Sequence, residues 1–387
     1  MGYHPIVVTV KPEFYEETLD YDIEKTVSKD IEVHKVDARP VRKPRIIGDI
    51  GIRGFRSMKK RALEIIAERK IDFIWIPIPS FYSSLLGPAI HKKTGVPYGI
   101  DYIDPWVRDA THLPGLRVKL SIAIAKVLEP IAVRRASLIS GVSRPYYEPV
   151  LERNFKNKSI ADVAMPYGFD PNDHKIELEG LKMPWSDQEG IKPIIYAGAF
   201  LPNSSNFMDL LFKALKDLRQ EGKLDPSIRL YFIGTGSYKH ESISTKAEKN
   251  AISDIVIEDR SRHPFLNILQ FLSHAYGLMI IGSTEMHYTA SKTFQSLLSE
   301  RPVFAVFHHL SSAVTMMKDT NASEYLVEYV DRENNQTLFE KMKTTWLKFQ
   351  EQRTEWNPDL TLLTPYSSKE SARKLAKKLD EILDHEM

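Results

Sequence analysis

The sequence predicts an α/β protein built from two successive domains, each a parallel β-sheet with helices on both faces. Three observations support this fold class. The chain has 387 residues, short apolar strands alternate with helices in its first half, and the alternation restarts after a polar stretch at 170–192. A chain of this length exceeds what one hydrophobic core usually organises. Strands that are apolar throughout are typical of parallel sheets buried on both faces.

The first domain is expected to alternate five short strands with three longer helices. Its strands are predicted at 5–10, 31–36, 71–78, 96–102 and 137–142. Its helices are predicted at 57–70, 83–93 and 116–136.

The second domain repeats this alternation. Its strands are predicted at 194–197, 228–233, 255–257, 277–281 and 303–307. Its helices are predicted at 206–220, 267–274, from 292 to the Arg-Pro turn at 301–302, and 335–353, and a terminal helix is predicted at 367–383. We therefore assign 1–172 to an N-terminal domain, 173–364 to a C-terminal domain and 365–387 to the terminal helix, with 170–192 as the interdomain linker.

Composition excludes several classes of protein. The chain has no Cys, so disulfides and thiolate metal sites are excluded and a cytoplasmic location is favoured. The 12 His show no metal-binding spacing, and we expect neither a metal nor a cofactor. No apolar run approaches the roughly 20 residues of a membrane span. No basic run with interleaved aromatic residues is present, so a nucleic-acid partner is not expected.

Charge is shared unevenly between the two halves. Residues 1–175 carry a net charge of +6 and residues 176–387 a net charge of −4. Segment 115–135 is apolar with basic flanks, and segment 53–70 is basic and amphipathic. Both patterns predict peripheral contact with the inner face of a membrane. The alternatives are ordinary surface lysines and helix faces buried in the core.

The segment around Lys292 is the most informative part of the chain. A polar loop leads into a helix, the helix ends at Arg301-Pro302, and a buried strand follows. Lys292 lies in the first helical turn, where free backbone N–H groups and the helix dipole favour an anion. The pattern predicts a site for a phosphorylated ligand. The alternative is a solvated lysine.

Six segments in order resemble the motifs of family-4 retaining glycosyltransferases. They are DFIW at 72–75 with SFYSSLLG at 80–87, GVPYGIDYIDPW at 95–106, MPYGFD at 165–170, YAG at 196–198, FIGTG at 232–236 and YTASKTFQSLLSERPVFAV at 288–306. The resemblance implies the GT-B fold, in which two Rossmann-like domains face a cleft and the last helix crosses back to the N-terminal domain. It also implies a hexosyltransferase-like activity in polysaccharide biosynthesis. A UDP- or GDP-linked sugar would be transferred, with retention of configuration and without a metal, to a glycan or lipid-linked acceptor.

The resemblance places the donor site in the C-terminal half. The donor-binding residues that it implies are Gly198, Asn203, Ser204, Gly234, Gly236, Glu285, Ser291, Lys292, Thr293 and Gln295. Lys292 would neutralise the donor diphosphate, and Ser291 and the Thr293 N–H would donate hydrogen bonds to it. Gln295 occupies the position of a glutamate that binds ribose hydroxyls, and its carbonyl can still accept.

Two residues are catalytic candidates. His287 takes the place of the family's other glutamate, for which Glu285 is a substitute two residues earlier. Asp104 follows a strand end in the N-terminal half, together with the acceptor-side candidates Ser80, Trp106, Arg108 and Asp109. The alternative for Asp104 is a helix cap or a structural ion pair, and the alternative for the 234–236 glycines is an ordinary turn.

Besides the two replaced glutamates, the chain departs from the family pattern at two further places. Segment 199–206 holds no basic residue where the family usually clamps the diphosphate. The family's opening strand and Gly-rich loop have no counterpart before Pro5, from which we expect a truncated chain, the alternative being a lost strand. The departures at Gln295, at His287 and in segment 199–206 leave a second hypothesis, a non-catalytic homologue that binds a sugar or a partner protein. A third hypothesis is a sugar-nucleotide 2-epimerase, but the catalytic carboxylates that this chemistry needs are not recognisable in the sequence.

Overall fold

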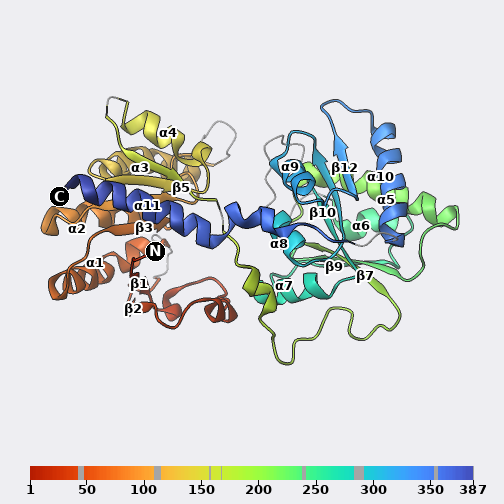
Figure 1. Ribbon diagram of the computed structural model, residues 1–387, viewed down its shortest axis with the longest axis horizontal. Coiled ribbons are helices and arrows are strands. Elements are labelled where there is room, and N and C mark those ends of the chain that lie inside the picture. Colours follow the sequence, from red (N-terminus) through yellow and green to blue (C-terminus); the bar gives the residue numbers. More distant parts are fainter. Residues whose placement is uncertain are drawn as a thin grey trace. The chain divides into compact units, whose positions relative to one another are not determined.

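The computed structural model describes residues 1–41, 48–108, 115–156, 158–166, 168–237, 241–282, 292–352 and 356–386. The chain divides into two compact units (Figure 1). The first consists of Met1–Tyr21, Val27–Gly168 and Tyr366–Met387, and the second of Asp22–Thr26 and Phe169–Pro365. Both contain parallel sheets with helices, so the predicted fold class is confirmed.

The first unit has two separate parallel sheets. One pairs β1 (Ile6–Val10) with β2 (Glu32–Val36). The other has four strands in chain order: β3 (Ile74–Ile78), β4 (Tyr98–Tyr102), β5 (Leu138–Gly141) and β6 (Ala161–Ala164). Its helices are α1 (Ile50–Glu68), α2 (Leu86–Thr94), α3 (Leu116–Val133), α4 (Arg144–Asn154) and α11 (Ser368–Glu386).

Helix α1 joins the two sheets of the first unit. Val10 of β1, Met58 of α1 and Ile76 of β3 are buried in one hydrophobic cluster. Gly54 permits this approach, because a Cβ atom there would lie 2.6 Å from a methyl group of Val10. At the start of the helix, Asp49 caps the Ile52 N–H. The β1–β2 pair is therefore held to the rest of the unit by apolar packing.

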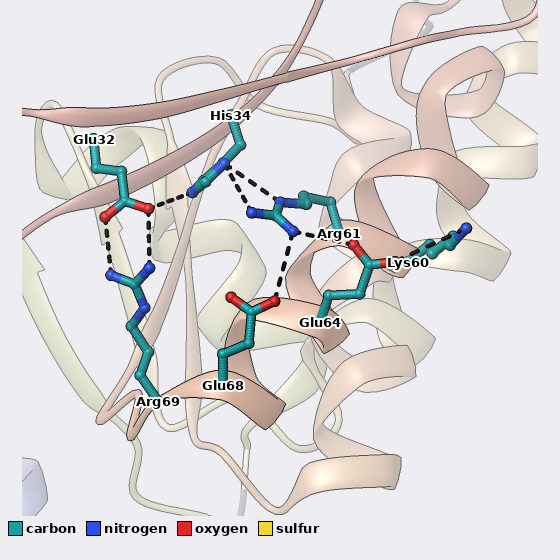
Figure 2. A network of polar contacts seen from close by, with 7 residues as sticks. All are labelled: Glu32, His34, Lys60, Arg61, Glu64, Glu68 and Arg69. Atoms are coloured by element: carbon teal, nitrogen blue, oxygen red, sulfur yellow. Dashed lines mark hydrogen bonds and ion pairs between the residues drawn. The ribbon is translucent and has the colours of Figure 1, made fainter.

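A network of charged side chains ties β2 to the same helix (Figure 2). Arg69, just after α1, donates to both carboxylate oxygens of Glu32, at 2.9 and 3.1 Å. His34 Nε2 lies 2.6 Å from the same carboxylate, and Arg61 lies 3.2 Å from His34 Nδ1. Arg61 also contacts Glu64 at 3.2 Å. The bonds from Arg69, together with that from His34, lower the pKa of Glu32.

The C-terminal helix α11 belongs to the first unit, as the resemblance implies, although Phe169–Pro365 of the second unit separates it from β6 in the sequence (Figure 1). Leu379 and Ile382 pack with Leu138 of β5 and with Phe73. At the start of the helix, Ser371 donates a 2.8 Å hydrogen bond to the Pro166 carbonyl. The helix thus covers one face of the four-stranded sheet.

The second unit contains one six-stranded parallel sheet in the order β12-β11-β10-β7-β8-β9. Its strands are β7 (Lys192–Ala197), β8 (Ile228–Ile233), β9 (Val256–Asp259), β10 (Gly277–Ile281), β11 (Val303–His308) and β12 (Leu326–Tyr329). Its helices are α5 (Ser205–Gln220), α6 (Ile243–Lys249), α7 (Phe265–His274), α8 (Lys292–Leu298), α9 (Ser312–Asp319) and α10 (Asn335–Glu351). The strand order reverses between β7 and β10. This is the doubly wound order, in which ligands bind at the reversal.

The alternation of side chains along β7 separates two hydrophobic cores. Ile194 and Tyr196 point into a core with α5 and α10. Ile195 points into a second core with α7, α8 and α9. Because both faces of the strand are buried, β7 is apolar along almost its whole length, as expected for a central parallel strand.

The stretch predicted to be the interdomain linker is instead packed onto the second unit. It begins with a short 3₁₀ helix at Pro171–Lys175. Leu178, Leu181, Met183 and Trp185 then lie against the hydrophobic core beneath α7. The prediction was wrong because widely spaced apolar residues in a polar segment do not show the periodicity of a helix or a strand.

The structure also contains elements that the sequence pattern does not predict: α4, β6, α6, α9 and β12. Helix α4 carries Pro145 and Pro149, which usually end helices. Pro145 lies in the first turn, where a missing N–H removes no intrahelical bond. None of the helices in the described part of the chain is long and apolar enough to span a membrane.

We predict that Glu32→Gln slightly destabilises the first unit at neutral pH. Because the folded-state pKa of Glu32 is lowered, its ion pairs stabilise the fold above the usual value of 4.5 and are lost as the pH falls through the folded-state pKa. Thermal unfolding should show a Tm drop of at most about a few degrees at pH 7 and a smaller drop at pH 3.

Glu68→Gln provides the control for this substitution, because Glu68 lies 3.9 Å from Arg61 and is more than half exposed. It should leave the Tm unchanged at both values of pH. An equal loss for Glu32→Gln at pH 3 and pH 7 would contradict the assignment to ion pairing.

Candidate functional site

A cavity of about 420 Å³ lies in the second unit where the strand order reverses. The carboxyl ends of β7 and β8, part of β10, helix α7 and the first turn of α8 form its walls. The sequence-predicted donor residues that line it are Gly198, Gly234, Gly236, Lys292 and Gln295. Its volume falls in the range usual for small-molecule sites.

Lys292 is the first residue of α8, and its ammonium group lies over the carboxyl end of β7. Its Nζ donates a 3.1 Å hydrogen bond to the Tyr196 hydroxyl and lies 4.2 Å from the centre of that ring. The Tyr196 hydroxyl in turn donates to the Ala199 carbonyl, at 2.8 Å. The tyrosine thus holds the lysine by a hydrogen bond and a cation–π contact.

The surroundings of Lys292 lower its pKa to about 8, because burial removes water from the ammonium group. Within the described residues, no carboxylate forms an ion pair with it. The buried Lys246 differs in this respect, since its Nζ contacts Asp209 at 2.7 Å. A desolvated cation without a counterion is costly, and a bound anion would remove that cost.

Glycines allow the strand ends to line the cavity closely. Gly198 has a φ of +111°, and a Cβ atom there would lie 3.3 Å from Lys292 Nζ. Gly234 and Gly236 have φ values of +73° and +77°. The Gly198 N–H bonds to the Ile233 carbonyl and the Gly234 N–H to the Asp259 carbonyl, both at 2.8 Å. Backbone hydrogen bonds between neighbouring segments thus continue beyond the ends of the strands and hold the loops that line the cavity.

The loop after β9 supplies basic residues that the sequence analysis missed. Arg260, Arg262 and His263 all line the cavity. Arg260 lies 3.5 Å from Glu258, and His263 lies 2.7 Å from Asp259. Positive charge is thus present although segment 199–206 has none. The signal was available, because ligands bind at the carboxyl ends of parallel strands and this basic segment directly follows one.

Gln295 is positioned by a chain of neutral hydrogen bonds. Its Oε1 lies 2.8 Å from His174 Nε2, and His174 Nδ1 lies 3.0 Å from Ser273 Oγ. Because Oε1 can only accept, Nε2 carries the proton and Nδ1 accepts from the serine hydroxyl. Burial lowers the pKa of His174, which favours this neutral form. The carbonyl oxygen of Gln295, which was expected to accept hydrogen bonds from ribose hydroxyls, therefore already accepts one hydrogen bond from His174.

Other predicted donor residues lie outside the cavity lining. Ser204 is buried and donates a 2.7 Å hydrogen bond to the Gly282 carbonyl, and Asn203 precedes it in a 3₁₀ turn. Thr293 is fully buried, and its Oγ1 has no hydrogen-bond partner within the described chain. The remaining candidates of this half fall outside the described residues: Glu285, His287 and Ser291.

In the first unit, two of the predicted acceptor-side residues, Trp106 and Arg108, lie against Phe81. Trp106 is buried and stacks on Phe81, with ring centroids 6.0 Å apart, and Arg108 lies 5.9 Å from the centre of the Phe81 ring. Ser80 accepts from the Gly51 N–H and donates to Asp49, so it supports the start of α1. Asp104 is partly exposed after β4, and Asp109 lies outside the described residues.

One carboxylate that the sequence analysis did not single out lies at the end of β4. Asp101 is buried and accepts a 2.7 Å hydrogen bond from Ser140, whose hydroxyl also accepts from Trp75 Nε1 at 3.3 Å. Desolvation raises the pKa of Asp101. Separately, no cluster of three or more His, Asp or Glu suited to a metal ion occurs among the described residues.

Comparisons with solved structures identify the fold. A glycosyltransferase from Rickettsia africae ESF-5 matches with a TM-score of 0.57 at 14% identity, over 99% of this chain and 91% of that one. Anabaena Alr3699/HepE in complex with UDP matches with a TM-score of 0.58 at 12% identity, over 97% and 100%. The pneumococcal O-GlcNAc transferase GtfA in complex with UDP and GlcNAc matches with a TM-score of 0.51 at 12% identity, over 86% and 61%.

No protein-family model and no curated protein sequence matches this chain. At the identities of the solved structures, the likeness establishes the fold, which is that of the GT-B glycosyltransferases. The GT-B fold expected from the sequence is therefore confirmed. The roles of individual residues in binding a donor stay predictions.

We predict that Lys292→Met stabilises the protein. At pH 7 the ammonium is charged in both states and is desolvated only in the folded state, so its removal should raise the unfolding free energy by about 1–2 kcal/mol. The gain should shrink from pH 8 toward pH 10.5, because the folded wild-type protein then loses the proton and the cost. Urea unfolding at several values of pH measures this difference.

Lys348→Met is the matched control, since Lys348 is exposed on α10. It should change the unfolding free energy by less than about 0.5 kcal/mol. A clear loss of stability in Lys292→Met would mean that the Tyr196 contacts outweigh the desolvation of the ammonium.

Proposed function

We propose that this protein is a glycosyltransferase that binds a nucleotide sugar in the cavity at the reversal of strand order and transfers the sugar to an acceptor. The observation that carries the proposal is the partly buried ammonium of Lys292, which has no carboxylate partner among the described residues and faces a cavity also lined by Arg260 and Arg262. Such a cavity favours a ligand with concentrated negative charge, and a diphosphate is one.

Each part of the cavity has a role in this proposal. Lys292 and Arg262 bind the diphosphate and stabilise the charge that develops on it when the sugar leaves. The positive-φ glycines let the backbone approach the phosphates closely. Gln295, held by His174, contacts the nucleoside or sugar hydroxyls with its amide group. The apolar wall from α7 packs against the flat parts of the ligand.

The donor that we propose is UDP-linked. Anabaena Alr3699/HepE was solved with UDP-glucose, and GtfA was solved with UDP and GlcNAc. From the motif resemblance, we also propose that the sugar is transferred with retention of configuration to a glycan or a lipid-linked acceptor. We also propose that no metal is required, since the basic side chains supply the charge that a cation would bring.

Calorimetry with UDP and UDP-glucose tests the binding step. We expect a Kd between about 1 μM and 1 mM for the wild-type chain. Lys292→Ala should weaken binding at least about tenfold, because a charge-assisted hydrogen bond is lost, and Arg262→Ala should weaken it less. Lys348→Ala should leave the Kd unchanged, as should EDTA.

Turnover then separates the transferase from a protein that only binds. Release of UDP from UDP-glucose, with and without a panel of glycan and lipid-linked acceptors, is the measurement. Binding that depends on Lys292 without any turnover would support the non-catalytic alternative. If the folded chain bound neither UDP nor UDP-glucose, that result would contradict both the transferase proposal and the non-catalytic alternative.

We predict that the affinity for UDP-glucose falls above pH 8. The diphosphate of a nucleotide sugar keeps its charge between pH 6.5 and 9.5, whereas the Lys292 ammonium has a pKa of about 8 in the free protein. Only the protonated lysine attracts the diphosphate. The Kd should therefore be nearly constant below pH 8 and rise by up to about tenfold per pH unit above it.

Lys292→Arg provides the comparison, because a guanidinium stays charged throughout this range. Its Kd for UDP-glucose should be independent of pH up to about 9.5, whatever its absolute value. A wild-type affinity that does not change between pH 7 and 9.5 would exclude Lys292 as the residue that binds the diphosphate.

A further inference from the structure

Helix α3 of the first unit exposes a continuous apolar stripe. Leu116, Leu120, Ile124, Val127 and Ile131 are 86, 60, 38, 65 and 51% exposed. Their spacing of four, four, three and four residues places them on one face of the helix, within an arc of about 80°. The stripe is about 20 Å long. Scattered exposed apolar residues are common, but an ordered row of this length marks an interaction surface.

The stripe lies opposite the face that α3 uses in the fold. Ile122, Ala125, Ala132 and Val133 are buried, and the last three belong to the core around Tyr98. The helix is therefore apolar on two opposite sides. Packing within the unit explains one side only, and the stripe faces away from it.

Basic side chains border the stripe on both sides. Arg117 and Arg135 flank one edge, Lys119 and Lys126 flank the other, and Arg134 follows at the end; all five are exposed. Within the described residues, none of the five takes part in an ion pair. The acidic residue of the helix, Glu129, is buried and paired with Arg153 at 2.8 Å. Five positive charges thus remain unneutralised around an apolar row.

We infer that α3 docks the protein onto the surface of an anionic lipid bilayer. The stripe would enter the boundary between headgroups and acyl chains, while the lysine and arginine side chains extend to the headgroup phosphates. Charge complementarity selects this occupant. In a symmetric contact between two copies, the basic borders would face one another and repel. A bilayer supplies anions on both sides of the exposed face of the helix.

This docking is independent of the proposed donor site, which lies in the other unit. Vesicle flotation of the full chain tests it. We expect binding to phosphatidylcholine vesicles with about 30 mol% phosphatidylglycerol, and several-fold less binding to pure phosphatidylcholine. Salt at about 0.5 M should also reduce binding, because it screens the headgroup charge.

Two substitutions test the stripe itself. Leu120→Glu and Val127→Glu each place a carboxylate in the apolar row and should reduce the bound fraction at least about tenfold. Leu310→Glu is the matched control, because Leu310 of the second unit is also 60% exposed. All three variants should keep the wild-type Tm and the wild-type affinity for UDP, so lost flotation cannot be ascribed to unfolding.

Several outcomes would overturn the inference. Failure of the wild-type protein to bind either kind of vesicle would contradict it, as would binding of the stripe variants at the wild-type level. Loss of binding in Lys126→Glu but not in Leu120→Glu would reduce the interaction to charge alone, without insertion. A dimer in sedimentation that dissociates in Leu120→Glu, with no vesicle binding, would assign the stripe to a contact between copies.

Discussion

The reversal of strand order between β7 and β10 is the constraint on which the candidate site depends. Connections from the two strands leave toward opposite faces of the sheet, so their carboxyl ends are not covered by one continuous layer. The apolar side chains of β7 pack into two separate hydrophobic cores, which fix the strand from both faces of the sheet. Loops that would otherwise be mobile are paired to one another past the strand ends. A cavity can therefore persist there, lined by backbone and by the first turn of α8.

Charge distinguishes this cavity from the structural parts of the protein. Two buried or partly buried cations with a structural role are neutralised by carboxylates: Lys246 by Asp209 and Arg153 by Glu129. Among the described residues, Lys292 has no carboxylate partner and is held by the hydroxyl and the ring of Tyr196. A fold that keeps a desolvated ammonium in this way gives up stability, and binding of an anion is the physical reason that we assign to it. The basic residues that border the apolar stripe of α3 likewise form no ion pairs within the described residues, so their exposed charges can attract an anionic partner.

Sequence patterns predicted the central strands better than the edges. The bounds expected for β8 and β10 agree with the structure, because long apolar runs between polar turns leave little choice. Strand β9 extends two residues further than expected, to Asp259, and so the basic loop that follows it went unnoticed. Strand β6 has only four half-buried residues, too few to show a period. At the site, Lys292 and the three glycines predicted from the motifs line one cavity. Ser204 does not line it and instead donates a hydrogen bond to the Gly282 carbonyl, just after β10.

By itself the sequence determined the fold class, the alternation of strands and helices, and the position of a lysine at the start of a helix. These follow from local periodicity and turn residues, which act over a few positions of the chain. Only the tertiary structure decided which polar groups meet: His174 reaches Gln295, and Tyr196 reaches Lys292, across about a hundred residues of chain. It also decided which apolar faces are covered, since α3 and α5 each bury an apolar face but α3 leaves a second apolar row exposed. Burial and the pKa shifts that it causes depend on the complete packing, and no short stretch of sequence encodes that.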